Sequence, residues 1–236
     1  MNITIYTENG EHSLREEVLR VYPEGMNAAL KDIFNGDKDI TVRYAFSHDK
    51  NSGLDDEVLK NTDVLIWWGH MYHNMVSEET AQRIAERVWE GMGAIFLHSA
   101  HKSKPFMRLM GTSCDLKWRE DGLHERLWVT CPTHPIAEGI PESFVIPHEE
   151  MYGEHFDIPN PDEIVFMGWY KGGEVFRSGV TYRRGFGKVF YFQPGHETFG
   201  VYNQPEIRKI IKNAAYWAKP GVTKTLGCPM VQPLEK

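Results

Sequence analysis

The chain of 236 residues is poor in cysteine and in basic charge, and it has no long apolar run. Its three cysteines form no Cys-x-x-Cys pair, which argues against a disulfide framework and favours reduced thiols in a cytoplasm. The formal net charge of −7 argues against nucleic-acid or acidic-membrane partners. No apolar stretch approaches the roughly 20 residues that span a bilayer, and the N-terminus lacks the pattern of a signal peptide. We therefore expect a cytoplasmic protein that binds a small molecule.

The first half of the chain alternates predicted strands with predicted helices. Apolar or alternating runs predict strands at 3–7, 40–46, 63–68 and 94–97. Helical spacing predicts helices at 14–34, interrupted near Pro23, from Ser77 to about Glu90, and at 103–110. This alternation predicts an α/β fold with a parallel, doubly wound sheet.

The second half is less regular. Strands are predicted at 126–130, 143–146, 163–169, 175–183 and 188–192, followed by a helix at 205–218. Glycine-rich turns at 172–173 and 184–187 predict antiparallel hairpins added to the mostly parallel sheet. We expect a single domain over residues 1–220 and a proline-bearing tail over 221–236 that packs on the surface.

Two His-x-x-His pairs each follow a short run that is typical of a buried strand. His70 and His73 come after Val64–Gly69, and His98 and His101 come after 94–97. In an open parallel sheet the carboxyl ends of the strands form the rim of the ligand crevice. Imidazole is the usual side chain for binding a transition metal or moving a proton near neutral pH. The two pairs therefore predict a histidine-rich pocket.

Further groups of histidines and carboxylates strengthen this prediction, because a transition-metal site draws three or four donors from separate elements. They occupy the segments 8–12, 148–155 and 193–197. A single loop histidine is more often solvated or capping than a ligand, and an i, i+3 pair can simply share a helix face. The His-Glu-x-x-His signature of zinc proteases is absent.

Other common chemistries lack their motifs. The chain has no phosphate-binding loop of the Walker type and no Gly-x-Ser-x-Gly elbow, and the Gly185–Gly187 turn does not lie between a strand and a helix. None of the cysteines (Cys114, Cys131, Cys228) directly follows a predicted parallel strand, which argues against a cysteine nucleophile. The pattern indicates histidine and carboxylate chemistry.

Several segments of the chain resemble the ThuA-like trehalose-utilisation family. They are Trp67–His73, Leu97–His101, Arg108–Cys114, His148–Gly153 and Pro194–Thr198, and the resemblance extends to about Pro220. It implies a flavodoxin-like fold related to class I glutamine amidotransferases, and an association with sugar catabolism.

The relation to amidotransferases also implies a change of chemistry. Their nucleophilic cysteine lies on a strained turn, and His98 occupies what looks like that position here. His196 and Glu197 fall where those enzymes place a histidine and a carboxylate, and the Gly69–His70 loop resembles their oxyanion loop. Glutamine hydrolysis through a cysteine thioester is therefore excluded. If the overlay holds, His70, His98 and His196 converge.

The leading hypothesis is a metal-dependent enzyme, with zinc as the expected ion, that acts in the catabolism of a trehalose-type disaccharide or keto-sugar. We expect His70, His98 and His196 as ligands, with one coordination position open for water or substrate. Glu150 is the candidate general base, and Glu197 is expected to hold the ring of His196. A solvated loop carboxylate is the alternative for Glu150. Hydrolysis, isomerisation and proton abstraction beside a carbonyl all remain open.

Further site residues are predicted around this centre. Trp68 and Tyr152 are expected to line the sugar site, although a tryptophan at the end of an apolar strand is usually core. His73 and His12 are further substrate-side candidates, and His101 is a catalytic candidate. His73 and His101 could also be ligands, because i, i+3 pairs project together from a helical turn.

Two other hypotheses stay open. The chain could be a sugar-binding or regulatory module on a degenerate amidotransferase fold, without turnover. It could also be a metal-independent hydrolase that uses histidine and glutamate. Neither a nucleic acid nor a membrane is expected as partner, and a homo-oligomer is compatible with the sequence.

Overall fold

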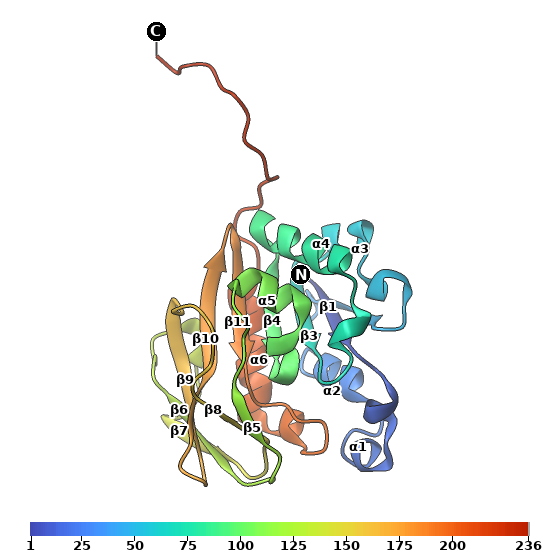
Figure 1. Cartoon of the computed structure of the whole chain (residues 1–236), viewed down its shortest axis with the longest axis vertical. Helices are drawn as coiled ribbons and strands as arrows, with labels where there is room; N and C mark the ends of the chain where they lie inside the picture. The colour runs from blue at the N-terminus through green and yellow to red at the C-terminus, as the bar shows by residue number, and fades with distance from the viewer. Residues whose placement is uncertain (236) are drawn as a thin grey trace.

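The computed structural model describes residues 1–235, which form a nine-stranded sheet with helices on both faces (Figure 1). The strand order is β2-β1-β3-β4-β11-β10-β9-β6-β7. The first five pair in parallel: β2 (Thr41–Phe46), β1 (Asn2–Thr7), β3 (Val64–Trp68), β4 (Gly93–Leu97) and β11 (Gly187–Phe192). The order of these five is that of a flavodoxin-like doubly wound sheet, whose ligands bind at the carboxyl ends of the strands.

The remaining strands extend the sheet in antiparallel fashion. They are β10 (Val175–Arg184), β9 (Glu163–Tyr170), β6 (Glu125–Val129) and β7 (Ser143–Ile146). The predicted fold class, a mostly parallel sheet with antiparallel additions in the second half, is therefore confirmed. A separate two-stranded antiparallel sheet of β5 (Lys117–Arg119) and β8 (Met151–Gly153) was not predicted.

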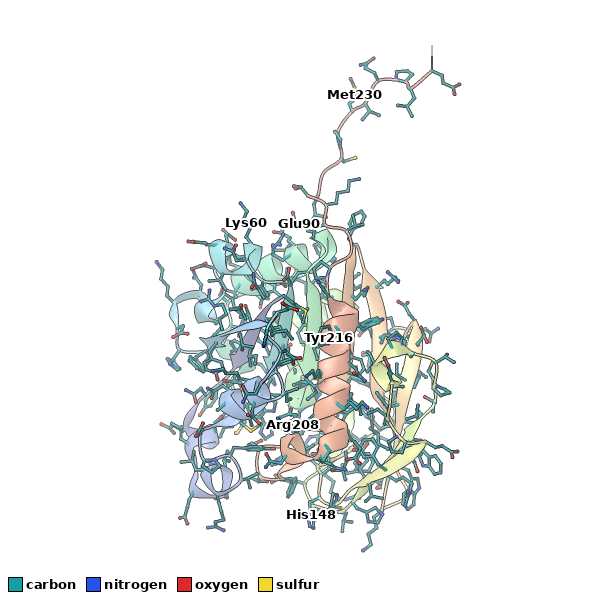
Figure 2. The ribbon with its side chains drawn as sticks, turned by 180° about the vertical axis from the view of Figure 1, so that it is seen from behind. Lys60, Glu90, His148, Arg208, Tyr216 and Met230 are labelled. Carbon is teal, nitrogen blue, oxygen red and sulfur yellow. The ribbon has the colours of Figure 1, made fainter. Side chains whose placement is uncertain are left out.

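The strand β3 shows why the parallel region is apolar on both faces. Its residues alternate between two buried clusters: Val64, Ile66 and Trp68 belong to one, and Leu65 and Trp67 belong to the other. The first cluster includes buried residues of α2 (Met26–Asp32) and α6 (Pro205–Ala218). The second includes residues of α3 (Asp56–Lys60), α4 (Glu78–Glu90) and α5 (Lys104–Met110). In Figure 2, seen from behind, α6 lies along the sheet.

Local signals set most helix boundaries. The hydroxyl of Ser77 caps α4 by accepting from the Thr80 N–H at 3.0 Å, and Gly91 ends the helix with a φ of 132°. The predicted helix at 14–34 is divided into a 3₁₀ turn (Glu11–Leu14), α1 (Glu16–Val21) and α2, with Pro23 between the last two. Predicted and observed boundaries otherwise agree within about two residues. The short helix α3 was not predicted.

The C-terminal segment begins against the body of the protein. The N–H of Lys224 donates to the Glu90 carbonyl at 2.8 Å, and the chain beyond it extends away from the sheet (Figure 1). Within residues 1–235, no helix combines the length and the apolar character needed to cross a membrane.

Candidate functional site

Three imidazoles converge at the carboxyl edge of the parallel sheet. His70 follows β3, His98 follows β4, and His196 lies in the loop after β11. The ring centroids are 5.5 Å apart for His70 and His98, 5.2 Å for His70 and His196, and 5.4 Å for His98 and His196. Residues separated by more than 120 positions in the chain thus meet at one point, as their placement after predicted strands indicated.

His98 lies on a strained turn directly after β4. Its φ of 55° is in the left-handed region, which costs a non-glycine residue roughly 1–2 kcal/mol. The turn is fixed by the Tyr191 hydroxyl, which donates to the His98 carbonyl at 3.0 Å. The Nδ1 atom of His98 lies 3.1 Å from the Gln193 carbonyl, so this nitrogen carries the proton and Nε2 is left with a free lone pair.

The loop that carries His196 is held by buried groups. Gly195 has a φ of 151°, and a Cβ there would lie 2.1 Å from the hydroxyl of Tyr202, so only glycine fits. The carboxylate of Glu149 accepts the N–H of Gly195 at 2.8 Å and that of His196 at 3.3 Å. The indole N–H of Trp68 donates to the Gly195 carbonyl at 3.0 Å. The position of the third imidazole is therefore fixed through its backbone.

Glu197 orients His70. Its Oε1 atom lies 2.9 Å from Nδ1 of His70, whereas its Oε2 atom is 3.9 Å from Nδ1 of His196. The expected partner of Glu197 was His196, but that ring instead has Nδ1 at 2.9 Å from the hydroxyl of Thr198. A carboxylate on the far nitrogen of an imidazole is the usual arrangement behind a metal-binding histidine. In His70 this contact leaves Nε2 for the centre, whereas Nδ1 of His196 also accepts the backbone N–H of Thr198 at 3.3 Å.

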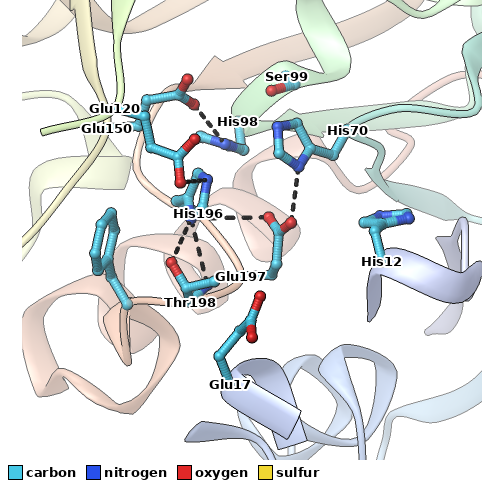
Figure 3. Close-up of polar contacts among 12 residues, drawn as sticks. His12, Glu17, His70, His98, Ser99, Glu120, Glu150, His196, Glu197 and Thr198 are labelled. Atoms are coloured by element: carbon cyan, nitrogen blue, oxygen red, sulfur yellow. Dashed lines mark hydrogen bonds and ion pairs between the residues drawn. The ribbon is translucent and has the colours of Figure 1, made fainter. Parts of the chain in front are cut away.

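Four donors surround the centre, as Figure 3 shows. His70, His98, Glu150 and His196 each offer one ligand atom, and these atoms all lie within 4.8 Å of one another. Among the described residues, Nε2 of His98, Nε2 of His196 and Oε2 of Glu150 are buried without a hydrogen-bond partner. Buried polar atoms are normally paired; Nε2 of His98 and Oε2 of Glu150 lie 3.2 Å apart, outside hydrogen-bond geometry, so the three atoms could share one bound partner. A cation fits all of them.

A second group lies behind His70. His12, His70 and Glu197 also offer ligand atoms within 4.8 Å of one another. His12 is buried, and its Nε2 atom lies 3.4 Å from Oε2 of Glu8. This group shares His70 with the first group, and Nδ1 of His70 already contacts Glu197. His12 and Glu197 therefore hold the ring of His70 on the side that faces away from the centre.

The electrostatics of the centre favour a cation. Burial lowers the pKa of His196 to about 4, and burial also acts to raise the pKa of Glu197 and Glu150. For Glu197 burial is the largest single influence, but the hydrogen bond from His70 and the charges of His70 and His196 together outweigh it and bring the pKa to about 2. For Glu150 the contact with His98 and the charges of the nearby imidazoles together lower the pKa. Burial lowers the pKa of His70, but Glu197 and other carboxylates more than offset this and raise it overall. Two carboxylates thus stay ionised beside the imidazoles.

The centre opens into a cavity of about 550 Å³, within the usual size range of small-molecule sites. Tyr152 forms part of its wall: its hydroxyl lies 2.6 Å from that of Ser99, and its ring stacks on His98 at 5.3 Å. Glu120 also faces the cavity, with Oε1 3.6 Å from Nε2 of His196. Trp118, in β5, lines the outer wall.

Other predicted site residues lie outside the group of four donors. Trp68 is fully buried in the core, so it supports the Gly195 loop and is not in the cavity wall. His101 is buried with Nδ1 2.7 Å from the Cys114 carbonyl, and burial lowers its pKa to about 3. His73 lines the cavity with Nδ1 3.7 Å from a Glu8 oxygen, and burial lowers its pKa to about 4. The second histidine of each pair therefore lies beside the centre.

Four residues of the site had no predicted role. Glu8 accepts the N–H groups of Met71 and Tyr72, each at 2.8 Å, and so fixes the loop that carries His70. Glu149 fixes the His196 loop. Both lie in histidine–carboxylate segments that the sequence analysis singled out. Trp118 lies in a strand of three residues and Glu120 directly follows it, and such a strand is too short to give a periodic signal.

Comparisons with known proteins agree with this architecture. The family model of ThuA, described as trehalose utilisation, matches residues 2–218. No curated protein matches the chain.

Solved structures share the fold at low sequence identity. A ThuA-like protein from Parabacteroides merdae is 18% identical, with a TM-score of 0.69, covering 97% of this chain and 92% of that one. A ThuA-like protein from Bacteroides uniformis is 17% identical, with a TM-score of 0.65, covering 92% and 90%. A glutamine amidotransferase from Thermotoga maritima is 12% identical, with a TM-score of 0.54, covering 92% and 96%. At these identities the likeness concerns the fold alone.

Proposed function

The chain belongs to the ThuA trehalose utilisation family, and from this membership and the geometry of the site we propose that it is a metal-dependent enzyme of carbohydrate catabolism. The family suggests a role in carbohydrate utilisation. The finer proposal is that His70, His98 and His196 bind a divalent transition ion, with zinc the ion best suited to three imidazoles.

The observation that carries this proposal is the set of buried, unpaired donor atoms that face one point. Nε2 of His98 and of His196 are buried, and no hydrogen-bond partner lies within residues 1–235. Nδ1 of His70 is occupied by Glu197, which leaves Nε2 for the ion. Three imidazoles leave a coordination position for water or a substrate oxygen, as catalytic zinc sites do. The bound ion would polarise a carbonyl or lower the pKa of a water molecule.

Glu150 is the residue that we propose to move the proton. It is buried, its Oε2 atom lies 3.2 Å from Nε2 of His98, and its pKa is lowered despite burial, so it is ionised at neutral pH. An ionised carboxylate beside the reacting group can accept a proton from water or from a carbon next to a carbonyl. The substrate that we propose is a trehalose-type disaccharide or a keto-sugar, because the cavity next to Glu150 has room for a small carbohydrate.

Glutamine amidotransferase chemistry is not part of this proposal. The position after β4, on the left-handed turn, holds an imidazole at His98 and carries no thiol. Burial raises the pKa of Cys114 to about 11, so this thiol is protonated at neutral pH and is a poor nucleophile.

The test combines metal analysis with the Glu150→Gln variant. Protein purified without chelator should contain close to one equivalent of zinc per chain, and removing it with EDTA should abolish turnover of trehalose or its keto derivative. Glu150→Gln should keep the zinc and lose about 10²- to 10⁴-fold in kcat. Loss of zinc in this variant would make Glu150 a ligand instead of a base. Metal-free protein that binds sugar unchanged would support the binding module and reject the enzyme.

A further inference from the structure

The short strand β5 and the residue on either side of it present one row of side chains to the cavity. Leu116, Trp118 and Glu120 all line it, whereas Lys117 and Arg119 do not. This alternation is that of a strand, in which every second side chain points to the same face. Glu120 reaches to 3.6 Å from Nε2 of His196, so the row begins beside the donor group. The strand is therefore a wall of the same site.

Trp118 is the unusual member of this row. Its exposed fraction is 65%, although the indole is among the largest apolar side chains. Fully buried tryptophans such as Trp67 contribute to the core, but the face of Trp118 is left to solvent inside a cavity whose other groups are mostly charged or polar. An exposed aromatic face in a binding cavity is suited to a ligand with an apolar face of its own.

The position of Trp118 relative to the donors is fixed by strand pairing. Trp118 is directly opposite Tyr152 in the β5–β8 register, and directly opposite residues point to the same face. Tyr152 in turn stacks on His98 with ring centroids 5.3 Å apart. Paired strands lie about 4.8 Å apart. The backbone that carries Trp118 therefore lies one strand spacing from the backbone that carries Tyr152, whose ring covers His98.

The strand is anchored on its opposite face. The guanidinium of Arg119 donates to Oε1 of Glu174 at 2.6 Å and also pairs with Asp121. These contacts hold β5 against the turn between β9 and β10, where Glu174 lies. The indole is therefore presented by a fixed backbone, which lowers the entropy cost of binding a ligand on it.

We propose that Trp118 is a stacking platform for a second sugar ring, so that the substrate is a disaccharide or another glycoside whose far ring lies on the indole. This inference rests on the proposed function for the ring that binds at the donor group. The C–H groups on one face of a pyranose ring give it an apolar surface that matches an indole. The row from His98 through Tyr152 to Trp118 then runs from the reacting ring to the ring beyond it.

The experiment measures binding of trehalose and of glucose to the full-length, metal-loaded protein by titration calorimetry. Trp118→Ala should raise the Kd for trehalose about five- to tenfold and leave that for glucose within about twofold. Trp118→Phe should restore most of the affinity. Trp128→Ala is the matched control, because Trp128 is 42% exposed and does not line the cavity, and it should change neither Kd.

The outcomes separate this inference from the proposed function. Three outcomes would overturn the stacking platform. In the first, Trp118→Ala weakens the binding of trehalose and glucose equally; in the second, it weakens neither. In the third, the unsubstituted protein does not bind trehalose. Wild-type zinc content and zinc-dependent turnover would still stand in the first two cases. Conversely, selective loss of trehalose binding in a protein that takes up no metal would uphold the platform and reject the enzyme. Zinc content of each variant is measured alongside.

Discussion

The parallel and the antiparallel regions contribute different things to the site. The parallel strands β3, β4 and β11 are followed by the three imidazoles, and each imidazole lies in a turn that is fixed by hydrogen bonds to its backbone or its neighbours. The small antiparallel sheet of β5 and β8, with the loop before β8, supplies Glu150, Tyr152 and the outer part of the cavity wall. One region builds a rigid centre, and the other adds a carboxylate and an aromatic part of the wall around it.

Burial separates the imidazoles from the outer part of the cavity wall. His98 and His196 have exposed fractions of 0% and 2%, whereas Trp118 and the side chain of Glu120 are 65% and 54% exposed. A metal centre needs donor atoms held to a few tenths of an ångström, which buried strand ends provide. A substrate wall can vary without disturbing that geometry. We therefore expect substitutions in the parallel region to change metal binding, and those in β5 to change sugar affinity.

The largest expected effect comes from removing an imidazole of the parallel region. His98→Asn should lower zinc affinity by at least about 100-fold, because one of three proposed ligands is lost. Asparagine tolerates the left-handed backbone that His98 adopts, so the fold should be kept. Zinc content and affinity are measured by emission spectrometry and chelator competition. His48→Asn, at an exposed histidine, is the matched control. Unchanged zinc affinity in His98→Asn would remove this residue from the donor set.

A smaller effect is expected at Glu197, which contacts a proposed ligand but is not itself one of the three proposed ligands. Glu197→Gln removes the charge from the group that lies 2.9 Å from Nδ1 of His70, and it should weaken zinc binding about 10- to 100-fold. The absorption spectrum of the cobalt-substituted protein reports whether the ligand geometry persists. Glu11→Gln, in an exposed position, serves as control. An unchanged affinity would mean that Glu197 does not orient His70.

The smallest effect concerns the stability of the metal-free protein against pH. Burial lowers the pKa of His12, His73 and His196 to about 4, below the usual histidine value of 6.5. The unfolded chain therefore binds more protons between about pH 6.5 and 4, so stability should fall as pH falls through this window. His70 acts in the opposite sense: its raised pKa stabilises the fold at low pH, and this contribution is lost as pH rises through the folded value.

Burial also lowers the pKa of His101, to about 3, whereas it raises the pKa of Glu125 to about 8 and that of Glu149 well above its usual value. These two carboxyls act in the same sense as His70, so the effect of one lowered histidine is measured as a difference from a variant that lacks it. The drop of the thermal midpoint from pH 7 to pH 5 should be smaller in His73→Gln than in the unsubstituted protein by roughly 4–8 °C, which corresponds to about 2 kcal/mol for one histidine. Differential scanning fluorimetry on EDTA-treated protein measures it. An equal drop in the two proteins would show that His73 is not held neutral in the folded state.

Much of the fold could be predicted because its signals are local. The strand at 143–146 and the helix at 205–218 agree with the predicted bounds, since alternation and helical spacing extend over the whole of each element. The alternation of strands and helices predicted the parallel sheet, and a parallel sheet brings strand ends to one edge. The strands β5 and β8 escaped prediction because three residues carry too little pattern.

The sequence by itself determined the architecture and the edge of the sheet at which the histidines lie. The spacing of apolar residues and the order of strands and helices are local features that can be recognised in consecutive residues. Only the tertiary structure decided that His70 and His98, and not His73 and His101, face the centre. It also decided that Glu197 contacts His70. These choices depend on a left-handed turn at His98 and on hydrogen bonds between residues about 100 positions apart, which no local pattern encodes.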